Sequence, residues 1–159
     1  MESLLSASIV ALLMIVSPAF GDFSGRVVGV TDGDTIKVMS GGRAEKVRLY
    51  GIDCPERRQA FGQAAKKATS AYCFNKTVTV RVRDKDRYGR TIGVVILPSG
   101  KELGKELVRR GLAWWYQRYA PNDKELIRLE LDARKARRGL WKDPNPTPPW
   151  EFRRTRRSR

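Results

Sequence analysis

The chain has 159 residues, and 41% of them are hydrophobic, which is enough for one domain with a buried core and argues against a disordered chain. Lys and Arg outnumber Asp and Glu by 32 to 17, and this net charge of +15 favours a polyanionic partner. Charge alone leaves open a merely soluble basic protein or one that lies on anionic lipid. The chain has no histidine, so an imidazole base and a metal site built on His ligands are both excluded.

The first 21 residues have the pattern of a secretory signal peptide. An apolar run from Leu4 to Val16, too short to cross a bilayer comfortably, is followed by small residues at Ala19 and Gly21. We expect cleavage between Gly21 and Asp22, and a mature protein in the periplasm or outside the cell. Glu2 stands where a positive charge is usual, so a start further upstream or an uncleaved anchor remains open.

Five segments have the character of short β-strands with one buried face. In the fourth, Val78, Val80 and Val82 fall on one face, and in the third Arg48 lies opposite the apolar residues beside it. The turns between the first three segments are Asp-Gly-Asp and Ser-Gly-Gly sequences, which are typical of hairpins. The predicted strands span residues 23–30, 35–39, 45–50, 77–82 and 91–97.

Three further segments are predicted to be helices. Residues 62–73 are rich in Ala and Lys, and residues 102–110 end at Gly111, a favourable residue after a helix. The third helix begins after Pro121 and runs to about Arg138, with leucines along one face.

The order of these elements indicates the fold class. Five short strands with a helix between the third and the fourth is the order of an OB-fold barrel, a fold that often binds nucleic acids. We therefore predict a mixed α+β, mainly β protein: a five-stranded OB-fold barrel with three helices, over residues 22–143. Residues 144–159 form a Pro-rich segment followed by a basic tail.

The two cysteines, Cys54 and Cys73, leave two possibilities open. In an oxidising compartment they could form a disulfide, which would stabilise the fold by roughly 3 kcal/mol. Alternatively, one is a buried helix thiol and the other a loop thiol, and the two never meet.

Carboxylates in two loops are candidates for metal-assisted chemistry. Asp34 lies in an Asp-Gly-Asp-Thr turn that begins at Asp32, and Asp53 precedes Cys54 and a proline. Both aspartates also suit ordinary turns. If they converge, they could bind a cation that prefers oxygen ligands, Ca²⁺ or Mg²⁺, together with a main-chain carbonyl and waters. Glu56 could then deprotonate an attacking water, or it could be a solvated charge or a helix cap.

Arginines and tyrosines near these loops could bind a phosphodiester. Arg48 and Arg90 could together clamp the phosphate oxygens and stabilise the extra charge of a transition state, although a single arginine is more often surface charge. Tyr88 and Tyr119 could stack on a base or sugar, or they could line the edge of the core.

Taken together, these motifs resemble the staphylococcal nuclease family, over about residues 23–141. The shared motifs, in chain order, are Asp32 to Thr35, Arg48 to Glu56, Asp86 to Arg90, Leu107 to Ala113, and Tyr119 to Asn122. The ending from Gly139 to Glu151 is similar to that of exported Gram-negative members.

The resemblance implies a monomeric, Ca²⁺-dependent endonuclease that acts on DNA and RNA, leaves 3′-phosphates and has no stable membrane association after processing. Matching positions imply three groups of site residues. The metal ligands would be Asp34, Asp53 and the main-chain carbonyl of Cys54; the catalytic residues Arg48, Glu56 and Arg90; and the substrate-binding residues Arg87, Tyr88 and Tyr119.

Some positions depart from the family's pattern. The carbonyl ligand belongs to Cys54, where the staphylococcal enzyme has threonine, and a second tyrosine near the nucleotide is replaced by Gln117. The segment from Glu56 to Phe61 is also shorter than the corresponding mobile loop.

Two other functions fit the sequence less well than an enzyme does. A nucleic-acid-binding barrel without catalysis could lose its acidic residues, because carboxylates repel phosphates unless a cation lies between them; here all three remain. A membrane-surface protein is disfavoured because the basic tail lacks the interleaved apolar residues of an interfacial helix.

Overall fold

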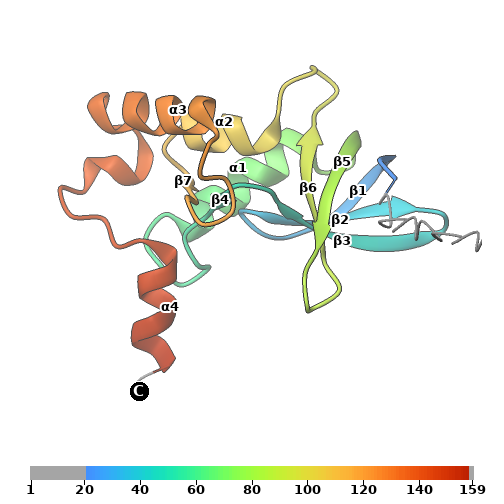
Figure 1. The fold of residues 1–159 in the computed structure, drawn as a ribbon, viewed down its shortest axis with the longest axis horizontal. Coiled ribbons are helices and arrows are strands. Elements are labelled where there is room, and N and C mark those ends of the chain that lie inside the picture. Colours follow the sequence, from blue (N-terminus) through green and yellow to red (C-terminus); the bar gives the residue numbers. More distant parts are fainter. Residues whose placement is uncertain (1–20, 158–159) are drawn as a thin grey trace, which may run out of the picture.

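The structure is a computed structural model that describes residues 21–157, so the expected leader lies almost entirely outside the described residues. Five strands form a closed barrel in the order β1-β2-β3-β6-β5, as the sequence predicts. Strands β3 and β6 pair in parallel and the other neighbours are antiparallel (Figure 1). The barrel strands are β1 (Phe23–Asp32), β2 (Thr35–Ser40), β3 (Arg43–Leu49), β5 (Thr77–Lys85) and β6 (Thr91–Ile96).

Alternation along the strands builds the barrel interior. Val78 and Val80 on β5 are buried, as are Val47 and Leu49 on β3, whereas Arg48 between them faces a cleft. The apolar side chains inside the barrel therefore fix which face of each strand carries the polar side chains.

Three helices occupy the positions that the sequence predicts. These are α1 (Gly62–Cys73), α2 (Leu103–Arg109) and α3 (Lys124–Lys135). The side chain of Asp123 caps α3 by accepting a hydrogen bond of 3.0 Å from the backbone N–H of Leu126. The third helix ends earlier than predicted, because the backbone turns into the left-handed region at Arg137 (φ 49°).

A short two-stranded sheet beside the barrel is absent from the sequence prediction. Strand β4 (Ile52–Asp53) pairs antiparallel with β7 (Trp114–Trp115), so that Asp53 lies opposite Trp114. Trp114 is buried and Trp115 is half-buried, in line with a packing role for both. This pairing fixes the backbone that carries Asp53.

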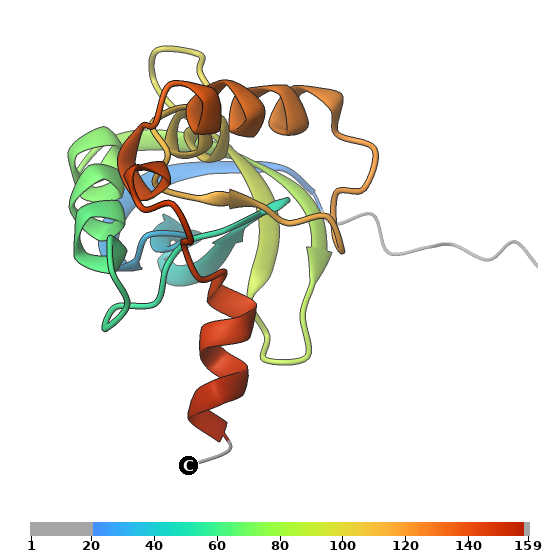
Figure 2. The same ribbon diagram turned by 90° about the vertical axis from the view of Figure 1, so that its left-hand side faces the viewer.

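The end of the chain contains a helix that the sequence analysis did not predict. After a 3₁₀ turn, η1 (Gly139–Lys142), the supposed basic tail forms a fourth helix, α4 (Pro149–Arg157). Its first residue is proline, which suits a first helical turn, and its arginines cluster at the carboxyl end. Figures 1 and 2 show α4 projecting from the rest of the molecule on the side away from α2 and α3.

Both cysteines are free thiols. Cys54 and Cys73 are buried, and the Sγ of Cys73 donates to the carbonyl oxygen of Thr69 at 3.1 Å. Burial raises the pKa of the Cys73 thiol to about 12 and that of Cys54 well above its ordinary value. In the structure, therefore, Cys54 and Cys73 do not form a disulfide with each other.

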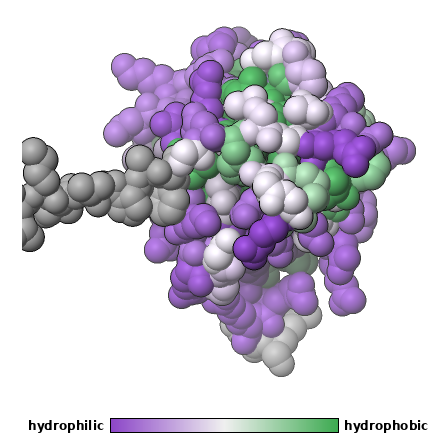
Figure 3. Space-filling view, turned by 90° about the vertical axis from the view of Figure 1, so that its right-hand side faces the viewer, coloured by the Kyte–Doolittle hydropathy of each residue, from purple (hydrophilic) through white to green (hydrophobic). Residues whose placement is uncertain are grey.

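The molecular surface is mostly hydrophilic where Figure 3 views it, with a smaller apolar area among the polar side chains. No helix between residues 21 and 157 combines the length and hydropathy needed to span a bilayer.

A tight corner between α2 and η1 generates a stability prediction. Gly111 has φ 67°, and a Cβ there would lie 2.2 Å from the carbonyl oxygen of Arg138, so Gly111→Ala should lower the free energy of unfolding by about 3 kcal/mol or more. Gly100 has φ 82° with open space around it, so Gly100→Ala should cost only about 1–2 kcal/mol. Urea denaturation of both variants measures the difference. Equal losses would contradict a steric role for this corner.

Candidate active site

All nine residues that the sequence predicts for the site line a single cleft of about 690 Å³. The cleft opens where the β1–β2 turn, the end of β3, strand β4 and the β5–β6 turn come together, and α4 borders it from another side. The nine residues are Asp34, Arg48, Asp53, Cys54, Glu56, Arg87, Tyr88, Arg90 and Tyr119.

The Asp34 carboxylate is fixed by hydrogen bonds on both oxygens. The backbone N–H of Cys54 donates to Oδ2 at 2.7 Å, and the Thr35 hydroxyl donates to Oδ1 at 3.2 Å. The backbone N–H of Leu49 donates to the Asp34 carbonyl at 2.8 Å, which ties the turn to β3. Asp34 is buried at the floor of the cleft, so its carboxylate is positioned before any ligand arrives.

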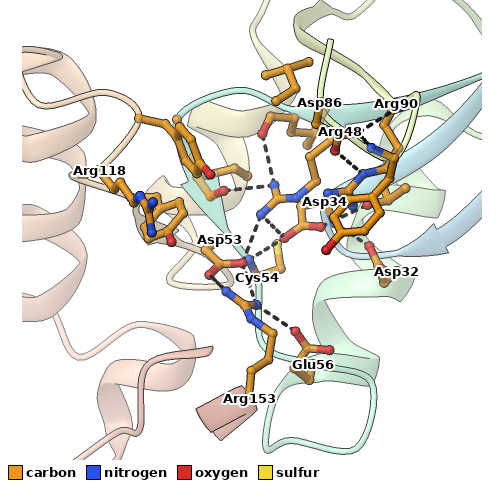
Figure 4. A pocket seen from close by; sticks show the side chains of 18 of the residues that line it. Asp32, Asp34, Arg48, Asp53, Cys54, Glu56, Asp86, Arg90, Arg118 and Arg153 are labelled. Carbon is orange, nitrogen blue, oxygen red and sulfur yellow. Dashed lines mark hydrogen bonds and ion pairs between the residues drawn. The ribbon is translucent and has the colours of Figure 1, made fainter. Parts of the chain in front are cut away.

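Arg48 joins the two aspartates that are predicted to bind the metal. Its Nη2 lies 3.3 Å from Asp34 Oδ2 and 3.0 Å from Asp53 Oδ1, while Nη1 donates to the carbonyls of Leu49 and Ile52 at 3.0 and 2.9 Å (Figure 4). Burial alone would lower the pKa of Arg48, but Asp34 and Asp53 outweigh it and raise the pKa. Arg48 thus remains charged and partly neutralises the pair.

Arg153, on α4, contributes a second cation that the sequence analysis did not predict. Its Nη2 lies 2.7 Å from Asp53 Oδ2, and its Nη1 lies 3.2 Å from Asp53 Oδ1 and 2.7 Å from Glu56 Oε1. Figure 4 shows the guanidinium between the two carboxylates. The run of arginines in the tail was visible in the sequence, but nothing in its spacing indicated that one of them reaches a site about 100 residues earlier.

Burial and neighbouring carboxylates raise the pKa of two aspartates in this part of the cleft. Burial raises the pKa of Asp53; Arg153 and Arg48 oppose that rise and Asp34 adds to it. Burial and then repulsion from Asp34 raise the pKa of Asp32 to about 6. Neighbouring buried carboxylates of this kind are a place where a bound cation is stabilised.

The β5–β6 turn presents Arg90 to the cleft through Asp86. Arg90 Nε donates to Asp86 Oδ2 at 2.6 Å, and Asp86 Oδ1 accepts the backbone N–H groups of Tyr88 and Arg90 at 2.9 and 3.0 Å. These hydrogen bonds outweigh the effect of burial and lower the pKa of Asp86. Asp86 lay within a recognised motif but was not predicted as a site residue.

Aromatic side chains rim the cleft. Tyr88 and Tyr119 are 67% and 53% exposed, so they are available for stacking rather than buried in the core. The Tyr88 hydroxyl accepts a hydrogen bond of 2.7 Å from Arg87 Nη2. Tyr116 also lines the cleft and packs edge-on against Tyr119, with ring centroids 5.0 Å apart, whereas Gln117 is exposed and is not among the lining residues.

The donor set is compatible with a hard cation. Asp34 and Asp53 each have a carboxylate oxygen in contact with the same Arg48 nitrogen, so the two carboxylates lie close together. Oxygen atoms are the ligands that Ca²⁺ and Mg²⁺ prefer. Among residues 21–157, no three acidic or cysteine side chains converge closely enough to hold a metal by themselves. A cation here would therefore need the main chain or water to complete its coordination.

Comparison with known proteins agrees with this geometry. The model of the family described as staphylococcal nuclease homologue matches residues 46–143. The chain is 42% identical to the micrococcal nuclease of Shigella flexneri, over 94% of this chain and 92% of that protein. It is 40% identical to Protein ParB of Escherichia coli, over 97% and 92%, and 44% identical to an uncharacterized endonuclease of Escherichia coli, over 83% and 86%. The chain therefore belongs to the staphylococcal nuclease family.

Proposed function

We propose that this protein is an exported, Ca²⁺-dependent endonuclease that hydrolyses phosphodiester bonds of DNA and RNA and leaves 3′-phosphates. Family membership and the names of its relatives support a nuclease. The observation that carries the finer proposal is the cleft itself, in which two buried aspartates, a more accessible glutamate and several arginines face one space.

The proposed metal ligands are Asp34, Asp53 and the carbonyl oxygen of Cys54. When bound there, Ca²⁺ supplies Lewis-acid polarisation of the phosphate and neutralises the charge between carboxylates and substrate. The hydrogen bond from the Cys54 amide to Asp34 connects two of these residues directly. The same bond holds Cys54 by its backbone, which explains how a residue other than threonine is accommodated at that position.

Glu56 is the proposed general base. Its side chain is 34% exposed, and its backbone N–H donates to Gln59 Oε1 at 3.0 Å, which orders the loop that carries it. Glu56 accepts a proton from water as the water oxygen bonds to phosphorus. The bond between phosphorus and the 5′ oxygen breaks, and the leaving 5′ oxygen takes up a proton from solvent water, so the products are a 3′-phosphate and a 5′-hydroxyl.

Arg90 and Arg48 are the proposed transition-state arginines. With Nε bonded to Asp86, Arg90 still has two Nη groups with which to donate to phosphate oxygens as negative charge accumulates. Arg48 partly neutralises the negative charge of Asp34 and Asp53 through its ion pairs with both. Arg87, Tyr88 and Tyr119 are positioned on the rim to contact the nucleotide, since they line the cleft and are exposed.

The remaining parts of the proposal concern location and organisation. Residues 1–21 act as a leader cleaved before Asp22, and the protein works as a monomer in the periplasm or outside the cell. We place the catalytic domain at residues 22–143 and treat residues 144–159, which include α4, as a C-terminal extension of it. The net charge of +15 supports attraction to a polyanionic substrate.

Cleavage of single-stranded DNA tests the enzyme proposal. The purified protein should cut in Ca²⁺, and chelator should abolish cutting; Mg²⁺ is run in parallel. Glu56→Gln and Arg90→Ala should each lower the cleavage rate by about 10²–10³-fold, because one loses the base and the other a charge-stabilising donor.

The matched control is Arg128→Ala, which removes the same charge from an exposed position on α3. It should leave the cleavage rate within about twofold. Tight, salt-sensitive DNA binding with no cutting in any metal would overturn the enzyme and leave a nucleic-acid-binding barrel.

The Asp86–Arg90 contact generates a separate prediction. Asp86→Asn keeps an oxygen for the two backbone N–H groups but loses the charged partner of Arg90, so kcat should fall about tenfold with little change in melting temperature. In an Arg90→Ala background the same substitution should have no further effect, as a double-mutant cycle would show. Additive losses would show that Asp86 does not act through Arg90.

A further inference from the structure

The helix α4 places the guanidinium of Arg153 against two carboxylates of the proposed site, the metal ligand Asp53 and the general base Glu56. Three short contacts, of 2.7, 2.7 and 3.2 Å, join the Arg153 guanidinium to Asp53 and Glu56. Arg153 and Arg157 line the same cleft as the nine predicted residues. The tail of the chain thus contacts the centre of the site rather than its periphery (Figure 4).

The docking of α4 does not depend on charge alone. Trp150 stacks on Tyr116 with ring centroids 5.3 Å apart and packs edge-on against Trp114 at 5.5 Å. The Gln59 side-chain amide donates to the carbonyl oxygen of Thr147 at 2.6 Å, just before the helix. An aromatic anchor and a loop contact therefore hold the helix in the orientation that brings Arg153 to Asp53.

Arg153 and a divalent cation require the same oxygen atoms. Both carboxylate oxygens of Asp53 accept hydrogen bonds from Arg153, and Oδ1 accepts a further one from Arg48. A cation such as Ca²⁺ needs direct access to those lone pairs. The same guanidinium also donates to Glu56 Oε1, so Arg153 occupies an oxygen of the proposed base as well.

We propose that α4 is an inhibitory helix, tethered to the catalytic domain, whose Arg153 competes with the metal ion for Asp53. Docked, it covers Asp53 and engages Glu56; released, it frees Asp53 Oδ2 and Glu56 Oε1, while Arg48 still donates to Asp53 Oδ1. The inference rests on the metal site of the proposed function. A helix docked in 90–99% of molecules weakens the apparent affinity for the metal by about 10–100-fold, since only the released fraction binds.

Calorimetric titration of the purified protein with Ca²⁺ measures this competition. Arg153→Gln should tighten Ca²⁺ binding by about 10–100-fold. Trp150→Ala should also tighten it, because it removes the anchor while leaving Arg153 in place. The matched control is Arg156→Gln, which removes the same charge from an exposed position on the same helix and should change the affinity by less than about twofold.

Hydrogen exchange supplies a second readout. Saturating Ca²⁺ should increase exchange of the α4 amides in the unsubstituted protein, because the bound ion displaces Arg153. In Arg153→Gln, Ca²⁺ should no longer change the exchange of α4, because the guanidinium that competes with the ion is gone while the Trp150 anchor remains.

Several results would overturn the inhibitory helix. The first is an equal Ca²⁺ affinity in the unsubstituted protein and in Arg153→Gln, and the second is weaker Ca²⁺ binding in Arg153→Gln. The third is that Arg156→Gln tightens Ca²⁺ binding as much as Arg153→Gln does. Asp53→Asn separates this failure from that of the metal site. If it abolishes Ca²⁺ binding while Arg153→Gln has no effect, the metal site stands and only the inhibition falls. If Asp53→Asn binds Ca²⁺ normally, or if no variant binds Ca²⁺, the proposed metal site and the inhibitory role of α4 are both contradicted.

Discussion

The arrangement of the site depends on one constraint: buried carboxylates close to each other must be neutralised. Asp34 and Asp53 are almost fully buried, and the pKa of Asp32 beside them is raised to about 6 by burial and by Asp34. A cluster of buried, ionised carboxylates destabilises the fold unless positive charge lies close to it. In the structure that charge comes from Arg48 on barrel strand β3 and from Arg153 on α4.

The fold supplies this arrangement from strands that are rigid for other reasons. Packing of Val47 and Leu49 inside the barrel turns Arg48 into the cleft, and the β4–β7 pair holds Asp53 opposite Trp114. Asp34 is fixed from the side by the Cys54 amide. Charged groups held by a packed scaffold need little rearrangement when a ligand binds, which is the property that electrostatic catalysis requires.

The same scaffold explains why α4 can act on the site. The helix is anchored through Trp150 to Trp114 and Tyr116, two residues within or next to β7. Trp114, which anchors α4, pairs with Asp53 across the β4–β7 sheet. The residue that holds the helix and the carboxylate that Arg153 covers therefore lie in the same two-stranded sheet. Release of α4 would therefore change the site without any change in the barrel.

Sequence patterns predicted most of the fold, because alternation in the strands and periodicity in the helices are local signals. The bounds of α1 were predicted to the residue, and the motifs around Asp34, Asp53 and Arg90 placed these residues in one cleft. The β4–β7 pair was missed because two residues per strand carry no pattern.

The helix α4 was missed for a different physical reason. Its prolines and arginines have the composition of a solvated tail, and what stabilises it is contact with Trp114, Tyr116 and Asp53, far away in the chain. Tyr116 was likewise missed, because only the packed structure shows which aromatic side chains of that loop face the cleft.

A crystal structure of the protein with excess Ca²⁺ tests the central claim most directly. The account predicts anomalous density for one cation between Asp34 and Asp53, with the Arg153 guanidinium withdrawn from Asp53. A cation bound elsewhere, or Arg153 still paired with both oxygens of Asp53 at saturating Ca²⁺, would contradict it.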